Sequence, residues 1–194
     1  RSHFDSEGEY LTFGAKESLD VLDWVDIVRK IYAPDIPIIL HGVSMGAATV
    51  LIAAGIYDNL VDDNSKPNII CCIADSPYDD IIGQIEHLLE ERSNITKKII
   101  IGLFKANMRL RAKANASDAS PITSMAYIKL PVMFVHGKDD RYVMPDNSLR
   151  LYEACKSEIK ELLIVEEAGH VCSFVVNPDE YEKVFASFVD RILE

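Results

Sequence analysis

A serine lies at the centre of a pentapeptide that could carry nucleophilic chemistry, GVSMG at 42–46. This G-x-S-x-G pattern is typical of a sharp turn that lifts a serine hydroxyl above a sheet, with flanking glycines where side chains would clash. An apolar run at 36–40 precedes the turn, and a segment rich in small residues follows at 46–56. This strand–turn–helix context predicts that Ser44 is a nucleophile and that the N–H of Met45 forms part of an oxyanion hole.

A serine hydroxyl is a poor nucleophile without a base, and the chain offers five histidines. His170 follows an apolar run, 162–165, on a glycine-containing loop, and its neighbours suggest no packing role. It is therefore the expected base. The others are His3 in a loop, His41 expected to be buried beside the turn, His87 in a helical segment, and His136 at the end of a third apolar run.

The imidazole of such a base needs a carboxylate to fix its tautomer and to stabilise its charged form. Asp139 and Asp140 both follow the apolar run 132–136, and Asp75 follows another run at 68–74. Asp75 precedes Ser-Pro, a position that suits a turn or a cap better than catalysis. The expected acid is one of the pair 139–140, which gives the chain order Ser, Asp, His.

The elements that must position these residues alternate along the chain. Short apolar runs are typical of parallel strands buried on both faces, and amphipathic or small-residue segments between them are typical of helices. This alternation predicts an α/β fold, a mostly parallel sheet flanked by helices, as a single domain over 1–194. The expected strands are 36–40, 68–74, 132–136 and 162–165, and the expected helices are 20–32, 46–56, 146–155 and 179–193.

The segment 81–116 interrupts this alternation with helical patterns and no strand. It is expected to be a cap or lid over the sheet edge, whose apolar residues would form the acyl or leaving-group pocket, or else an extra packing helix. A basic cluster from Lys97 to Lys113 alternates with apolar residues there. We interpret those cations as the solvent-facing sides of helices.

Composition restricts the functional classes. A formal net charge of −11 argues against nucleic-acid binding. The four cysteines form no CxxC pair and no disulfide framework, so reduced thiols, no metal site and a cytoplasmic location are expected. No apolar stretch approaches the roughly 20 residues that span a bilayer.

Four blocks of sequence resemble the α/β-hydrolase superfamily, in the branches of esterases, lipases and prolyl-oligopeptidase-like (S9-like) serine peptidases. They are RSHFDSEG at 1–8 with TFG at 12–14, the pentapeptide at 42–46, His-Gly at 136–137 with Asp140 and Val143, and Gly-His at 169–170. In these families the acid lies four residues after the histidine of the His-Gly pair, which selects Asp140. The first block departs from the usual Arg-Gly-His-Gly at Ser2 and Phe4.

The resemblance implies a serine hydrolase with the triad Ser44, Asp140 and His170. It would cleave an ester, or less favourably an amide or peptide bond, of a small-molecule substrate through an acyl-enzyme, with no metal or organic cofactor. Two alternatives stay open: a catalytically inactive binding module on the same fold, and an acyltransferase.

The resemblance also implies that the first block follows the fourth strand of an eight-stranded sheet. We therefore expect the chain to be the C-terminal part of a longer fold, with run 36–40 at a sheet edge. The preceding part would supply the second oxyanion N–H.

Overall fold

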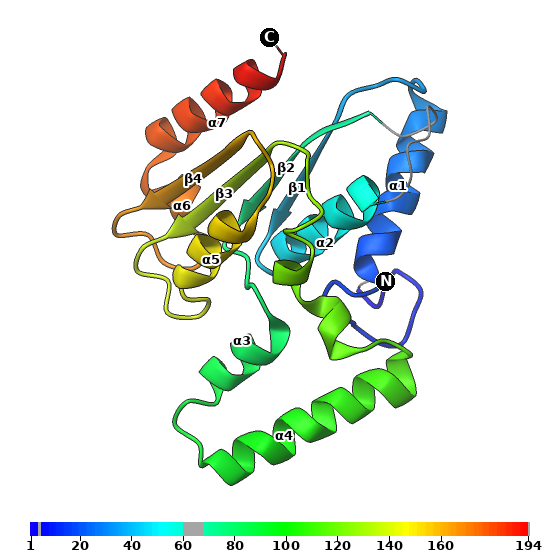
Figure 1. Ribbon diagram of the computed structural model, residues 1–194, viewed down its shortest axis with the longest axis vertical. Coiled ribbons are helices and arrows are strands. Elements are labelled where there is room, and N and C mark those ends of the chain that lie inside the picture. The colour runs from blue at the N-terminus through cyan, green and yellow to red at the C-terminus, as the bar shows by residue number, and fades with distance from the viewer. Residues whose placement is uncertain (4, 60–67, 194) are drawn as a thin grey trace.

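The computed structural model describes residues 1–3, 5–59 and 68–193, so the departure expected at Phe4 lies outside the described residues. Its centre is a sheet of four parallel strands in the order β1-β2-β3-β4 (Figure 1). The α/β fold with a parallel sheet is confirmed. The strands are β1 (Ile38–Val43), β2 (Ile69–Asp75), β3 (Val132–Gly137) and β4 (Lys160–Val165).

Helices cover both faces of this sheet. On one face, α2 and α5 pack on the strands, with α1 behind α2; on the other face lie α6 and α7 (Figure 1). Each expected helix is present with slightly different ends, and α6 was not expected. The helices are α1 (Glu17–Ile31), α2 (Met45–Asn59), α5 (Asp146–Ala154), α6 (Ser173–Val176) and α7 (Pro178–Leu193).

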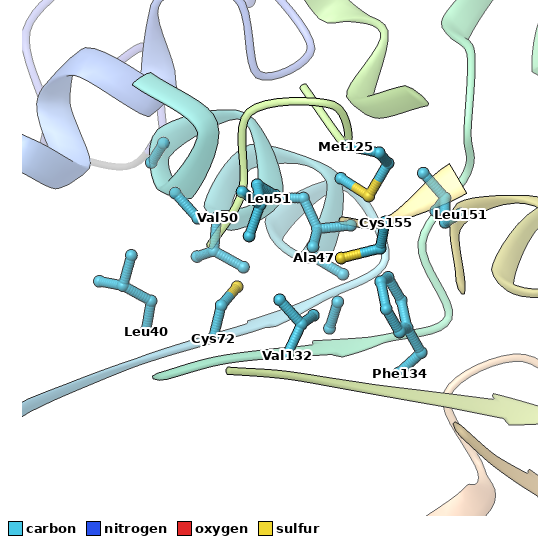
Figure 2. Packing of buried hydrophobic residues seen from close by; sticks show 14 of the residues in the cluster. Leu40, Ala47, Val50, Leu51, Cys72, Met125, Val132, Phe134, Leu151 and Cys155 are labelled. Atoms are coloured by element: carbon cyan, nitrogen blue, oxygen red, sulfur yellow. The ribbon is translucent and has the colours of Figure 1, made fainter. Parts of the chain in front are cut away.

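Strand β2 divides the core between the two faces, because successive side chains of a strand point in opposite directions. Cys72 packs toward α2 and α5 in the cluster that Figure 2 shows, whereas Cys71 packs toward α7. All four cysteines are free; Cys71, Cys72 and Cys155 are buried, and Cys172 is partly buried. Small residues on α2, such as Ala47 and Ala54, are fully buried and let the helix approach the sheet closely.

Strand β1 corrects one expectation. We expected its apolar run to be buried on both faces, but Leu40 is 5% exposed while Ile39 is 37% exposed. β1 is the edge strand that we expected, pairing with β2 alone in the part of the chain that the structure describes, and one of its faces is incompletely covered. For the same reason His41 is exposed rather than buried. It lines an apolar groove of about 690 Å³ that also includes Phe174 and Phe185.

The segment after β2 is helical, as expected. It comprises α3 (Ile81–Leu88), α4 (Asn94–Asn107), a π-helical turn (Met108–Ala112) and two 3₁₀ turns (Ala116–Ala119 and Pro121–Thr123). Asp80 caps α3 by accepting the Gly83 N–H at 2.8 Å. Figure 1 shows α3 and α4 beyond the end of the sheet at which the strands finish. Among the described residues, no helix is both long and apolar enough to cross a membrane.

Candidate active site

Ser44 stands in a strained turn between β1 and α2. Its φ of 53° lies in the left-handed region, and its N–H donates to the carbonyl of Asp75 at 2.8 Å. A Cβ on Gly42 would lie 2.2 Å from the carbonyl oxygen of Gly46, so glycine is required at that position. Our expectation for Gly46 was wrong: a Cβ there meets nothing within 4 Å. The turn therefore depends on one glycine rather than two.

Met45 is the first residue of α2. The first N–H groups of a helix have no carbonyl partner within it, and the helix dipole favours negative charge there. The Met45 N–H thus belongs to the class of donors that can stabilise an oxyanion beside Ser44.

His170 lies on the loop after β4, and its Nε2 is 2.9 Å from Ser44 Oγ. A close backbone approach sets the position of this loop: a Cβ on Gly137, at the end of β3, would lie 2.3 Å from the carbonyl oxygen of Ala168. The next residue, Val171, has a φ of 59°, which is unusual for a β-branched side chain. The surrounding structure thus fixes the loop against local preference, with His170 facing the serine.

Asp140 completes this line of contacts. Its Oδ2 is 2.6 Å from His170 Nδ1, and its Oδ1 accepts the N–H groups of Tyr142 and Val143, each at 2.9 Å. Burial alone would raise the pKa of this carboxyl, but hydrogen bonds from His136, His170 and Val143 outweigh it and hold the pKa well below its usual range. Asp139 is exposed and is not brought to the site.

His136 is a site residue that we did not predict. It is fully buried, and its Nε2 lies 2.9 Å from the Val143 carbonyl and 3.2 Å from Asp140 Oδ2. Because a carbonyl only accepts, Nε2 carries the proton, and Nδ1 accepts from the Ser148 hydroxyl at 2.7 Å. His136 thus contacts the same carboxylate oxygen of Asp140 as His170 does. The signal for it was the spacing of four residues to Asp140.

The rival acid, Asp75, is buried but makes no hydrogen bond with His170 among the described contacts. Its Oδ1 accepts from the Ser76 hydroxyl at 2.8 Å, and burial raises the pKa of its carboxyl. Ser76 Oγ in turn accepts the N–H of Val171 at 3.4 Å. This pair supports the His170 loop and the serine turn.

His87 and His3 contact backbone carbonyls elsewhere in the chain. His87 on α3 contacts the carbonyl of Arg141 at 3.0 Å, and His3 contacts that of Arg1. The thiol of Cys172 points to the carbonyl of His170 at 3.3 Å, so Cys172 is a neighbour of this histidine.

A cluster of aromatic and apolar side chains includes Met45, the residue that follows Ser44. Met45, Phe13 and Phe104 belong to one cluster, in which the two phenylalanine rings are 5.4 Å apart. The Tyr142 ring lies 5.0 Å from that of His170. Tyr78 is buried, and its hydroxyl donates to the Phe13 carbonyl at 2.7 Å. Tyr78 therefore holds the loop that contains Phe13.

Glu17 fixes the same loop from the other side. Its carboxylate accepts the Thr12 N–H at 2.8 Å, the Thr12 hydroxyl at 2.5 Å and the Gly14 N–H at 2.9 Å. Burial opposes the charge on Glu17, but these donors outweigh it and lower the pKa of the carboxyl. Phe13 is thereby held beside the turn, with a φ of 55°.

Serine, imidazole and carboxylate thus form a continuous series of contacts. In such a series the imidazole can take the hydroxyl proton while the carboxylate stabilises the resulting imidazolium. Within residues 1–3, 5–59 and 68–193, no group of three or more His, Cys, Asp or Glu side chains could hold a metal ion.

The chain is similar to several known proteins. The profile of a family described as "Serine aminopeptidase, S33" matches residues 84–174. A Bacillus subtilis (strain 168) protein, "Uncharacterized protein YqkD", is 29% identical over 192 residues, covering 99% of this chain and 60% of its own length. The chain therefore spans less than two thirds of that relative.

Two solved structures share the fold. The Pyrococcus furiosus esterase Pf2001 superposes with a TM-score of 0.65 at 24% identity, covering 98% of this chain and 68% of its own. The Pyrococcus horikoshii acylaminoacyl peptidase gives a TM-score of 0.64 at 17% identity, covering 92% of this chain and 28% of its own. Together with the parallel sheet, these likenesses show that the chain has the fold of α/β hydrolases.

Proposed function

We propose that this chain is the catalytic part of a serine hydrolase that cleaves ester bonds through an acyl-enzyme. The observation that carries the proposal is the unbroken series of contacts from Ser44 Oγ through His170 to Asp140, at 2.9 Å and 2.6 Å. These are hydrogen-bond distances for a nucleophile and its base and for a base and its orienting acid.

In the proposed reaction, Ser44 Oγ attacks the ester carbonyl while His170 Nε2 takes its proton. The tetrahedral oxyanion lies against the N–H of Met45. His170 then gives the proton to the leaving alcohol as the carbon–oxygen bond breaks. Water then attacks the acyl carbonyl while His170 Nε2 takes a proton from it. The bond between the acyl carbon and Ser44 Oγ breaks, His170 returns the proton to Ser44, and the acid is released. Asp140 stays ionised throughout, consistent with its lowered pKa.

An ester with an uncharged acyl group suits the surroundings best. Apolar side chains from three separate segments, Phe13, Met45 and Phe104, pack against one buried cluster, and Met45 directly follows Ser44. They can bury an apolar acyl chain without stranding a buried charge. The helical segment that contributes Phe104 would then act as the cap over this pocket, and amide or peptide substrates would be the less favoured alternative.

A fluorophosphonate probe tests the assignment, since it reacts covalently with activated serines and needs no knowledge of the substrate. We expect labelling of the wild-type chain and none of Ser44→Ala. Ser117→Ala is a matched control, because Ser117 is exposed and its hydroxyl contacts Asp118 rather than a residue of the proposed triad; that variant should still be labelled. A folded wild-type chain that is not labelled would contradict the proposal and favour a binding module.

A further inference from the structure

Helix α4 has two apolar faces, of which the protein uses one. Toward the body, Ile101 and Met108 are buried and Phe104 packs on Phe13. The opposite face carries an apolar stripe that contacts solvent. Its members are Ile95, Ile99 and Leu103, at 73%, 57% and 66% exposure, continued by Leu110 at 69%.

The stripe is continuous rather than scattered. Ile95, Ile99 and Leu103 are spaced by four residues, so they lie one above another along the helix. Figure 1 shows α4 at the lower margin of the molecule, with the rest of the chain on one side of it. Single exposed apolar residues are normal on a protein surface, but an ordered row is typical of an interaction site.

Charge distinguishes this surface from the rest of the chain. From Asn94 to Lys113 there are six Lys and Arg residues and no Asp or Glu, in a protein whose formal net charge is −11. Lys98, Lys105 and Arg109, which flank the stripe, are exposed. We interpreted these cations as the solvent-facing sides of helices, and that interpretation was incomplete, because the apolar residues among them are exposed as well.

An apolar stripe bordered by cations is the pattern of a helix that lies in the interface of an anionic bilayer. Apolar side chains enter the acyl boundary, while lysine and arginine extend to the headgroups. The acidic remainder opposes such contact weakly, because salt screens charges beyond about 8 Å at physiological ionic strength. We propose that the outer face of α4 and the following π turn dock this protein on anionic membrane surfaces.

Flotation with vesicles tests the proposal directly. The 194-residue chain would be mixed with vesicles of phosphatidylcholine alone, or of equal amounts of phosphatidylcholine and phosphatidylserine. We expect flotation with the anionic vesicles, loss of it at high salt, and much weaker flotation with the neutral ones. The result does not depend on the proposed catalytic function, because the readout is binding.

Two double variants separate the apolar and the charged contributions. Ile99→Gln with Leu103→Gln should weaken partitioning about a hundredfold, roughly what burial of two such side chains contributes. Lys98→Gln with Lys105→Gln should weaken it about fivefold per cation. Since all four side chains are exposed or on the outer face, the variants should unfold at the wild-type temperature, which a thermal melt checks.

Matched controls come from elsewhere on the surface. Trp24→Gln with Ile31→Gln removes an exposed apolar pair from α1, and Lys129→Gln with Lys156→Gln removes two exposed cations. Both controls should float like the wild type.

Three results would overturn the proposal. The first is that the chain does not float with anionic vesicles. The second is that the control variants lose as much flotation as the α4 variants. The third is that the lipid-free chain sediments as a dimer, which Ile99→Gln with Leu103→Gln dissociates. The last would show that a second copy of the chain covers the stripe.

Discussion

The approach of the His170 loop to Gly137 allows a quantitative prediction for Gly137→Ala. The new Cβ would lie 2.3 Å from the carbonyl oxygen of Ala168 and 2.5 Å from that of Gly169, both backbone atoms. Ordinary contact begins near 3.4 Å, so the two segments must separate by about 1 Å. β3 lies inside the sheet, paired on both sides, so the loop is the part that moves.

That shift reaches the serine directly. Moving the loop by about 1 Å lengthens the contact of 2.9 Å between His170 Nε2 and Ser44 Oγ to nearly 4 Å, beyond hydrogen-bond range. A misplacement of this size typically costs about 10²-fold in rate. We therefore expect kcat for a p-nitrophenyl ester to fall by roughly two orders of magnitude, or about 2.7 kcal/mol of barrier, with KM little changed.

The assay is steady-state hydrolysis together with the rate of fluorophosphonate labelling, which should fall in parallel. Gly102→Ala is the control: a Cβ there meets nothing within 4 Å, so its kinetics should match the wild type. Circular dichroism establishes that Gly137→Ala is folded. A folded variant with wild-type kcat and labelling would refute the inference that Gly137 sets the position of His170.

Two further predictions concern the carboxylates. Asp140→Asn should lower kcat by about 10⁴-fold, because the imidazole of His170 loses its orienting charge. Asp139→Asn, at an exposed position, should leave kcat unchanged. Steady-state kinetics measures both, and equal losses would contradict Asp140 as the acid of the triad. Stability should fall on acidification, because Asp140 and Glu17 have folded pKa values below their unfolded ones near 3.9 and 4.3. Their contribution is fully present above those unfolded values and is lost as pH falls through the folded ones. Urea unfolding at neutral and acidic pH should show a smaller decrease for Glu17→Gln than for the wild type; an identical decrease would show that Glu17 contributes nothing.

The serine turn could be predicted from sequence because three local signals coincide there: an apolar run, glycine before the serine, and small residues after it. The base required more, since only the position of His170 after a strand distinguished it from four other histidines. Local sequence signals could not distinguish Asp139 from Asp140. Both follow the same strand, and the direction in which each side chain points depends on how the loop packs, so the resemblance to known hydrolases had to decide.

Other features depend on tertiary context that a pattern does not contain. The apolar run of β1 is typical of a strand covered on both faces, yet one face of β1 is partly open, and His41 is exposed. The two apolar faces of α4 give equally good periodicities, and nothing in the sequence indicates that Ile101 is inside while Leu103 is outside. His136 resembled any strand-end residue until its contacts with Asp140 and Ser148 were known.

The contact between Ser44 and His170 joins residues 126 positions apart. Closing so long a loop costs entropy that local helix formation does not repay, so this contact should be among the last to form during folding. In a refolding experiment, helical signal should return first, and reactivity toward the fluorophosphonate only after β4 has joined the sheet. The reactivity of Ser44 toward the probe would therefore report when β4 has joined the sheet during folding.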